Sequence, residues 1–231
     1  MTGNGTDGKT MVDTLVPPLQ PTKPRFRGVL HQIAFLASIP LGFGLVAAAA
    51  TPAAKVAALV YSLGACALYG TSAAYHRGHW SERGRAWMRR LDHSMIFVLI
   101  AATYTPICVL GLEGGGATLT LIAIWAGATL GVVLGMAGLA QKPGVGMTLY
   151  LLMGWVAALS MPSIADRLGP LYLGLIVAGG LAYTVGAIGL ATNWPNPRPA
   201  TFGYHEVWHG FTLVAGSCFA VVVWGLVLRA G

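Results

Sequence analysis

Charged side chains are scarce in this sequence of 231 residues, of which they make up only 9%. A water-soluble domain carries about 25% charged residues, so the shortage excludes an ordinary soluble protein. Cysteine is scarce too, because Cys66, Cys108 and Cys218 each lie in an apolar run and no C-x-x-C pair occurs. This excludes a disulfide framework and gives no support to a thiolate metal site. Residues 1–24 lack the apolar stretch of a cleavable signal peptide, and we expect them to form a disordered cytoplasmic tail.

Long apolar runs are abundant, since 55% of the residues are hydrophobic. About 20 apolar residues suffice to cross a bilayer as a helix. The runs of that length cover residues 29–50, 53–75, 91–112, 118–138, 145–164, 170–192 and 205–228, with an Arg-rich break at 77–90. The sequence therefore predicts an all-α fold, a seven-transmembrane helix bundle, in one membrane domain over residues 25–231.

The net charge of +7 has to be interpreted through topology, because cationic loops face the cytoplasm. With seven spans, eleven of the 14 Lys and Arg residues fall on the side of the N-terminus. The other side has Lys55, Arg167 and Arg229. We therefore expect a multi-pass membrane protein with a cytoplasmic N-terminus, a C-terminus outside and no nucleic-acid partner.

Ionisable residues gather at the cytoplasmic ends of three spans. His76 ends the second span, Asp92 begins the third, and His205 and His209 begin the seventh within the string H-E-x-x-H. Polar residues at membrane depth are costly and tend to be functional. The span count and the charge rule together place these residues, with Ser72 one turn before His76, at one depth of one leaflet.

Three of these residues are the predicted metal ligands: His76, His205 and His209. Three imidazole nitrogens and a water form the open tetrahedral arrangement of a catalytic zinc site, where the pKa of the water falls to about 7. We predict catalytic roles for Asp92, which would hold or deprotonate that water, and for Ser72, which would hydrogen-bond water or substrate. The remaining histidines are expected to be hydrated or hydrogen-bonded without a direct metal role: His31, His79 and His93.

The H-E-x-x-H string does not indicate a zinc protease. Such enzymes complete their site with a His, Glu or Asp further downstream, and no such residue follows His209. Glu206 is more simply a helix N-terminal acid favoured by the dipole, or a partner of a ligand, than a general base.

At this point the motifs are similar to those of a known family. Ser72-x3-His76, RRLDHSMIFVLIAATYTP at 89–106 and FGYHEVWHGF at 202–211 resemble the haemolysin III branch of the progestin and adiponectin receptor (PAQR) superfamily. The resemblance covers roughly residues 25–228 and implies seven spans with the N-terminus inside. It also implies zinc ligands at His76, His205 and His209, a conserved serine at Ser72 and a water-contacting aspartate at Asp92.

The resemblance leaves the function open. Animal relatives are hormone receptors proposed to hydrolyse ceramide, related superfamily members are lipid amide hydrolases, and bacterial members are linked to membrane lipid homeostasis. One hypothesis is a zinc-dependent hydrolase of a membrane lipid amide or ester. A second is a non-enzymatic sensor or regulator of membrane lipid with structural zinc, and a third is a pore-forming haemolysin. The expected partner is a membrane lipid, as substrate or ligand.

Two further features allow two interpretations each. Gly127, Gly131 and Gly135 form a small-residue ridge that favours close helix packing, within the chain or between copies. The Arg-rich segment 77–90, with Trp80 and Trp87, is typical of topogenic charge with interfacial anchors, and it could also bind anionic headgroups.

Overall fold

The structure is a computed structural model that describes residues 23–142 and 144–231. These residues contain seven helical segments that are long and apolar enough to cross a membrane, which confirms the predicted all-α, seven-span fold. The helices are α1 (Val29–Ala48), α2 (Pro52–Arg77), α3 (Glu82–Pro106) with η2 (Ile107–Gly111), α4 (Gly115–Met136), α5 (Val145–Trp155) with η3 (Val156–Ser160) and α6 (Met161–Leu168), α7 (Pro170–Thr192) and α8 (Tyr204–Arg229). All but the last two residues of the predicted tail at 1–24 lie outside the described part.

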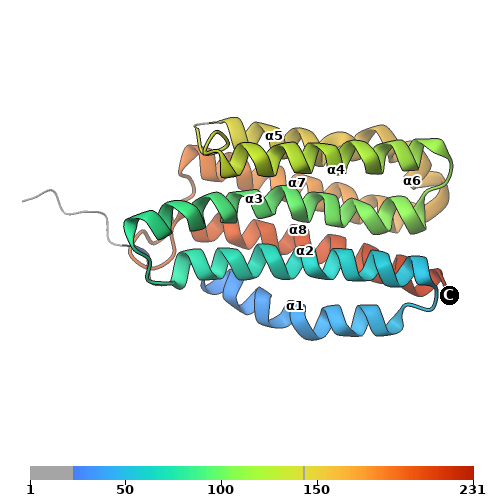
Figure 1. Ribbon diagram of the computed structural model, residues 1–231, viewed down its shortest axis with the longest axis horizontal. Coiled ribbons are helices and arrows are strands. Elements are labelled where there is room, and N and C mark those ends of the chain that lie inside the picture. Colours follow the sequence, from blue (N-terminus) through green and yellow to red (C-terminus); the bar gives the residue numbers. More distant parts are fainter. Residues whose placement is uncertain (1–22, 143) are drawn as a thin grey trace, which may run out of the picture.

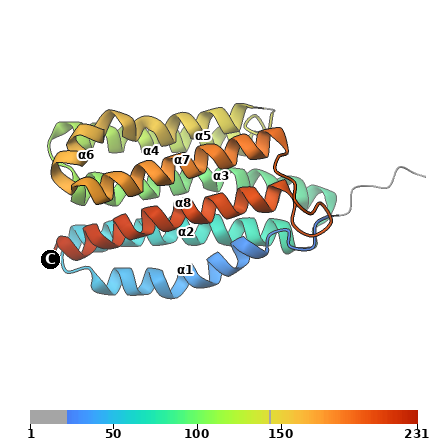
Figure 2. The same cartoon turned by 180° about the vertical axis from the view of Figure 1, so that it is seen from behind.

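The helices run side by side along the long axis of the molecule (Figure 1 and, from behind, Figure 2). Helix α8 packs against α1, α2, α3 and α7, so it occupies the middle of the bundle. One face of α8 packs Val222 against Ile164 and Ile176. The next face packs Val223 against Leu45 and Ala58. Helix α8 thus contributes to both apolar cores through its C-terminal half.

Helix α3 begins at Glu82, nine residues before the start of the apolar run at 91–112 from which this span was predicted. The Arg-rich segment predicted as a break at 77–90 is helical from Glu82 onward, and only a short connection separates it from α2. The Ser81 side chain accepts a hydrogen bond from the Gly84 N–H at 3.2 Å, and Glu82 lies in the first turn. A capping serine and an acid near the helix N-terminus stabilise such a start. The helix thus extends past its apolar part with arginines on its surface.

The fifth span is interrupted between α5 and α6. Pro162 follows the break, and a proline cannot donate the backbone hydrogen bond that would continue α5. The Tyr104 hydroxyl of α3 donates to the Gly154 carbonyl at 2.8 Å and accepts from the Ala157 N–H at 2.6 Å. Backbone groups freed inside a membrane need such partners. A side chain of another helix, Tyr104 of α3, therefore stabilises the break.

The glycine ridge of α4 faces other helices of the same chain. A Cβ on Gly131 would lie 2.5 Å from the Phe97 ring of α3, and a Cβ on Gly127 would lie 3.4 Å from the Met153 sulfur of α5. Gly135 lies against the Ser94 hydroxyl. The small residues thus allow α4 to approach α3 closely.

Candidate metal centre

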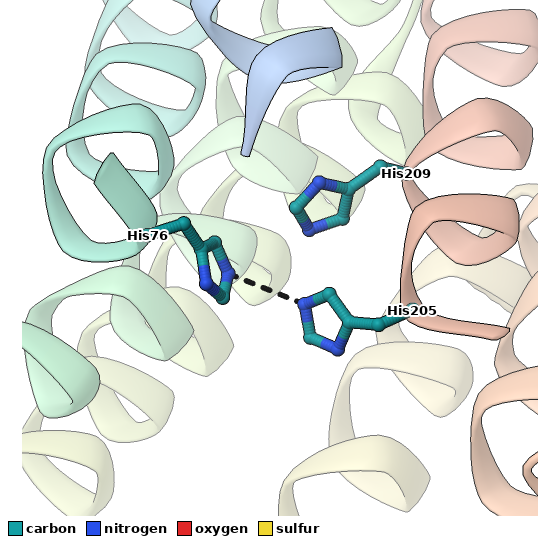
Figure 3. Close-up of side chains that lie close together, drawn as sticks. All are labelled: His76, His205 and His209. Carbon is teal, nitrogen blue, oxygen red and sulfur yellow. Dashed lines mark hydrogen bonds between the residues drawn. The ribbon is translucent and has the colours of Figure 1, made fainter. Parts of the chain in front are cut away.

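Three histidines from two helices meet at one end of the bundle (Figure 3). His76 lies in the last turn of α2, whereas His205 and His209 lie in the first two turns of α8. Side chains at positions i and i+4 share a face of a helix, so both α8 rings point toward α2. Their convergence follows from the packing of α8 against α2.

The spacing of the three rings suits a bound cation. One nitrogen from each of His76, His205 and His209 lies within 4.8 Å of the others. The Nε2 atoms of His76 and His205 are 3.2 Å apart. Two nitrogens bound at about 2.0–2.1 Å to one tetrahedral ion lie roughly 3.3 Å apart. The three histidines are therefore close enough to hold a metal ion, as the sequence predicted.

The chemistry of the cluster also fits a metal. His209 is 2% exposed, and its Nδ1 has no hydrogen-bond partner among the described residues. A buried polar atom without a partner is unfavourable, which argues that this ring has a role beyond packing. Imidazole donors without a thiolate are typical of sites for zinc and its neighbours among the divalent transition metals. The residues present fit such an ion.

His31 of α1 packs against His209 and holds its ring in place. Its ring stacks on His209, with centroids 3.8 Å apart and planes 7° from parallel. Its Nδ1 lies 2.8 Å from the Ser72 hydroxyl, and its Nε2 lies 2.8 Å from the Thr212 hydroxyl. His31 is hydrogen-bonded, as expected, yet it is also part of the site. No motif pointed to Thr212, which is one of several threonines in apolar helices.

The direction of these hydrogen bonds follows from Thr212. Its hydroxyl donates to the His209 carbonyl at 2.7 Å, so toward His31 it accepts. The Nε2 of His31 is then the protonated nitrogen, and its Nδ1 accepts the proton of Ser72. The Ser72 oxygen is thereby left as an acceptor toward the rest of the site.

Asp92 lies beside the cluster and outside it. Its Oδ2 is 4.0 Å from the His76 Nε2. Asp92 is not part of the group of His76, His205 and His209, whose ligand atoms all lie within 4.8 Å of one another. Asp92 lies in the third turn of α3. Its carboxylate is thus placed to contact a small molecule next to the histidines.

Glu206 serves the helix rather than the cluster. It is 1% exposed, its Oε1 pairs with Arg27, and its Oε2 accepts the Gly203 N–H at 2.7 Å. The side chain therefore fixes the first turn of α8, in line with its expected place at the helix N-terminus, and both of its oxygens are occupied. This role of Arg27 is not visible in the sequence, where the residue is one of several cations that precede the first span.

The segment that precedes α1 lies across this end of the bundle. The Arg25 N–H donates to the Ala200 carbonyl at 3.1 Å, and the Phe26 N–H donates to the Thr201 carbonyl at 3.0 Å. The Lys23 ammonium donates to the His76 carbonyl. Burial and the nearby Arg85, Arg27 and Arg77 lower the pKa of Lys23. The segment thus connects the end of α2, where His76 lies, to the loop that precedes His205 in α8.

A cavity of about 200 Å³ adjoins the cluster. Its polar lining includes His31, Ser72, Asp92, His205 and His209. The predicted catalytic residues and two of the three predicted ligands therefore border one space. Of the remaining histidines, His93 lines the same cavity, whereas His79 is exposed in the connection between α2 and α3.

Comparisons with known proteins identify the family of the chain. The family model described as Haemolysin-III related matches residues 19–220, most of the chain. The chain belongs to the haemolysin III family. This confirms the resemblance to the haemolysin III branch of the PAQR superfamily and makes the chain a multi-pass membrane protein.

Individual relatives of this haemolysin III chain come from bacteria and animals. Hemolysin-3 of Bacillus cereus is 31% identical over 188 residues, which cover 80% of this chain and 83% of the relative. The Hemolysin-3 homolog of Bacillus subtilis is 28% identical, with coverage of 80% and 85%. The human monocyte to macrophage differentiation factor is 26% identical, with coverage of 76% and 72%.

Proposed function

We propose that the protein is a zinc-dependent hydrolase that cleaves an amide or ester bond of a membrane lipid at the cytoplasmic face of the bacterial inner membrane. The observation that carries this proposal is the junction of two cavities. The polar cavity beside the histidines shares Leu68, Ile96, Tyr150, Trp208 and Thr212 with a second cavity, which is almost wholly apolar.

The second cavity suits an acyl chain. It has a volume of about 100 Å³ and extends among α3, α5, α7 and α8, as far as Ile164 and Ile176. Apolar pockets with a few convergent polar groups at one end are typical of ligand sites. A lipid with its chain among these residues would have its first carbonyl at the level of the histidines.

The polar residues provide the chemistry of hydrolysis. A zinc ion held by His76, His205 and His209 would polarise the carbonyl and lower the pKa of water to about 7. Asp92 accepts the proton of the attacking water and delivers it to the nitrogen or oxygen that leaves. The new bond joins the water oxygen to the acyl carbon, the amide or ester bond breaks, and the products are a fatty acid and an amine or alcohol.

Ser72 has a narrower role in this proposal. Its proton is donated to His31, as the hydrogen bonds of Thr212 require. Its oxygen is therefore an acceptor, which suits it to orient the attacking water and makes it a poor donor to the substrate carbonyl. His31 acts through Ser72 and is a positioning residue.

The test is release of fatty acid from ceramide and from phospholipid by the purified, zinc-loaded protein, beside a known hydrolase as positive control. We expect Asp92→Asn to lower the rate at least 100-fold, the lower range of general acid–base catalysis. Asp166→Asn is the matched control, because Asp166 is exposed on α6 at the opposite end. Intact lipids after prolonged incubation with the wild-type protein would exclude the hydrolase.

The names of the Bacillus relatives raise a pore as the second candidate. In the described spans, however, the Asp, Glu, Lys, Arg and His side chains lie near the two ends, and the central part of the bundle contains apolar clusters. Ion pathways are lined by charged groups or carbonyl rings along their length. This distribution supports the hydrolase. A structural-zinc sensor would instead place Asp92 at the spacing of a fourth ligand.

A further inference from the structure

Two residues at the mouth of the polar cavity have no part in the proposed reaction. Gln141 and Lys142 belong to the connection between α4 and α5, and both line the cavity that His205, His209 and Asp92 also line. Neither residue belongs to a motif that the sequence analysis singled out. Their position raises the question of what they bind.

The carboxamide of Gln141 is in an unusual state. Its nitrogen and its oxygen are both buried, and neither has a hydrogen-bond partner among the described residues. An amide carries two donor hydrogens and an acceptor oxygen, and burying them unpaired is costly. Native proteins contain few such groups, and each calls for an explanation. Because the side chain borders the cavity, its natural partners are the contents of that cavity.

The charge around the mouth favours an anion. Lys142 is exposed and has no ion-pair partner in the described part of the chain. Two acids lie at this end: Glu206 is paired with Arg27, and Asp92 lies deeper in the cavity beside His76. A lysine ammonium is a common binder of phosphate groups. A ligand that places a phosphate near Lys142 and a hydrogen-bonding group near Gln141 would match both residues.

We propose that Gln141 and Lys142 form a headgroup subsite for an anionic glycerophospholipid. The headgroup phosphate pairs with Lys142, its hydroxyl groups exchange hydrogen bonds with the Gln141 amide, and the acyl chain continues past the histidines into the apolar cavity. This inference rests on the proposed function for the entry of a lipid into the cavity, and it narrows the substrate class to anionic phospholipids. It does not require that the lipid be cleaved.

The experiment measures lipid binding by native mass spectrometry of the full-length protein, without any turnover. The probes are phosphatidylglycerol and a diacylglycerol with identical chains. We expect phosphatidylglycerol to bind about tenfold more tightly, the size of one hydrogen bond to a charged group. Gln141→Leu and Lys142→Gln share this preference, so each should lower the affinity for phosphatidylglycerol about threefold and leave that for diacylglycerol unchanged. Lys55→Gln, an exposed lysine at the other end, is the matched control.

Two further measurements decide between the alternatives. Thermal unfolding of Gln141→Leu should be unchanged or raised, because the substitution removes an unpaired buried amide. A lower unfolding temperature, with equal losses for both lipids, would make the amide structural and overturn the subsite. Equal binding of both lipids by the wild-type protein would overturn it too. Soluble glycerol 3-phosphate should not compete, and competition as strong as that of the phospholipid would assign the site to a soluble anion.

The outcome separates this inference from the proposed function. Preferential binding of phosphatidylglycerol without any hydrolysis would exclude the hydrolase and retain the subsite. Hydrolysis without a headgroup preference would retain the hydrolase and exclude the subsite.

Discussion

The ring of His31 lies flat against the ring of His209, 3.8 Å away and within 7° of parallel. His31 is fixed by hydroxyl groups on both of its nitrogens, whereas the Nδ1 of His209 has no partner among the described residues. Within the stacked pair, hydrogen bonds hold the ring of His31, whereas none holds the Nδ1 of His209, the candidate metal ligand. The orientation of the ligand is determined by helix α1, which contributes no ligand itself.

Replacing His31 by leucine should therefore weaken metal binding. Groups that orient ligands typically contribute about 10- to 100-fold to metal affinity, and we expect a loss in that range for zinc, measured by competition with a chelator. His31→Gln retains a donor and an acceptor, and should lose less. His79→Ala changes an exposed histidine and should bind zinc like the wild-type protein. Unchanged affinity in His31→Leu would show that the stack is incidental.

The ion pair between Arg27 and Glu206 is expected to stabilise the fold. Glu206 is 1% exposed, and removing one partner of a buried pair costs about 3–5 kcal/mol. We predict that Arg27→Met lowers the unfolding temperature in detergent strongly, and that adding Glu206→Gln restores part of the loss.

The comparison pair for this experiment is Arg167 and Glu113, which are 2.8 Å apart and whose side chains are 43% and 76% exposed. Exposed pairs contribute about 0–1 kcal/mol, so Arg167→Met should change the unfolding temperature little. Equal effects at the two pairs would contradict the structural role of Glu206.

Close packing of α4 on α3 predicts a large effect at Gly131. A Cβ there would lie 2.5 Å from the Phe97 ring, and overpacking typically costs about 1–3 kcal/mol. Gly131→Ala should lower the free energy of unfolding by that amount. Gly174→Ala is the matched control, since nothing lies within 4 Å of its Cβ position and alanine is the better helix former. A stable Gly131→Ala would mean that α4 and α3 do not approach closely.

The orientation in the membrane stays a prediction of the charge distribution. Eleven of 14 cationic residues on one side predict that this side is cytoplasmic. In intact cells, a membrane-impermeant thiol reagent should label Glu113→Cys and leave His79→Cys unlabelled until the cells are lysed. The opposite pattern would invert the topology and move the histidine cluster to the outer leaflet.

The fold could be predicted because its signal is repeated along the chain. Each span is an apolar run of sufficient length, and the charge between runs is unevenly distributed. The early start of α3 was missed because a surface helix that is capped by Ser81 and rich in arginine has no apolar periodicity of its own. The break before α6 depends on the Tyr104 hydroxyl of another helix, which no local pattern reveals.

The site, too, has residues that could be predicted from the sequence and residues that could not. His76, His205 and His209 could be predicted because span ends fix depth, and three histidines at one depth are unusual. The roles of Thr212 and Arg27 could not, because they depend on which face each helix turns to its neighbours. The role of Gln141 could not be predicted for a different reason. It is inferred from the missing hydrogen bonds of its buried amide, which only the structure reveals.

The most direct test of the account is the metal content of the detergent-purified protein, measured by mass spectrometry beside His76→Ala and His205→Ala. The account predicts about one zinc ion per chain in the wild-type protein, lost in both variants although their total helix content by circular dichroism is unchanged. A wild-type protein that contains no metal after zinc reconstitution would contradict the central claim.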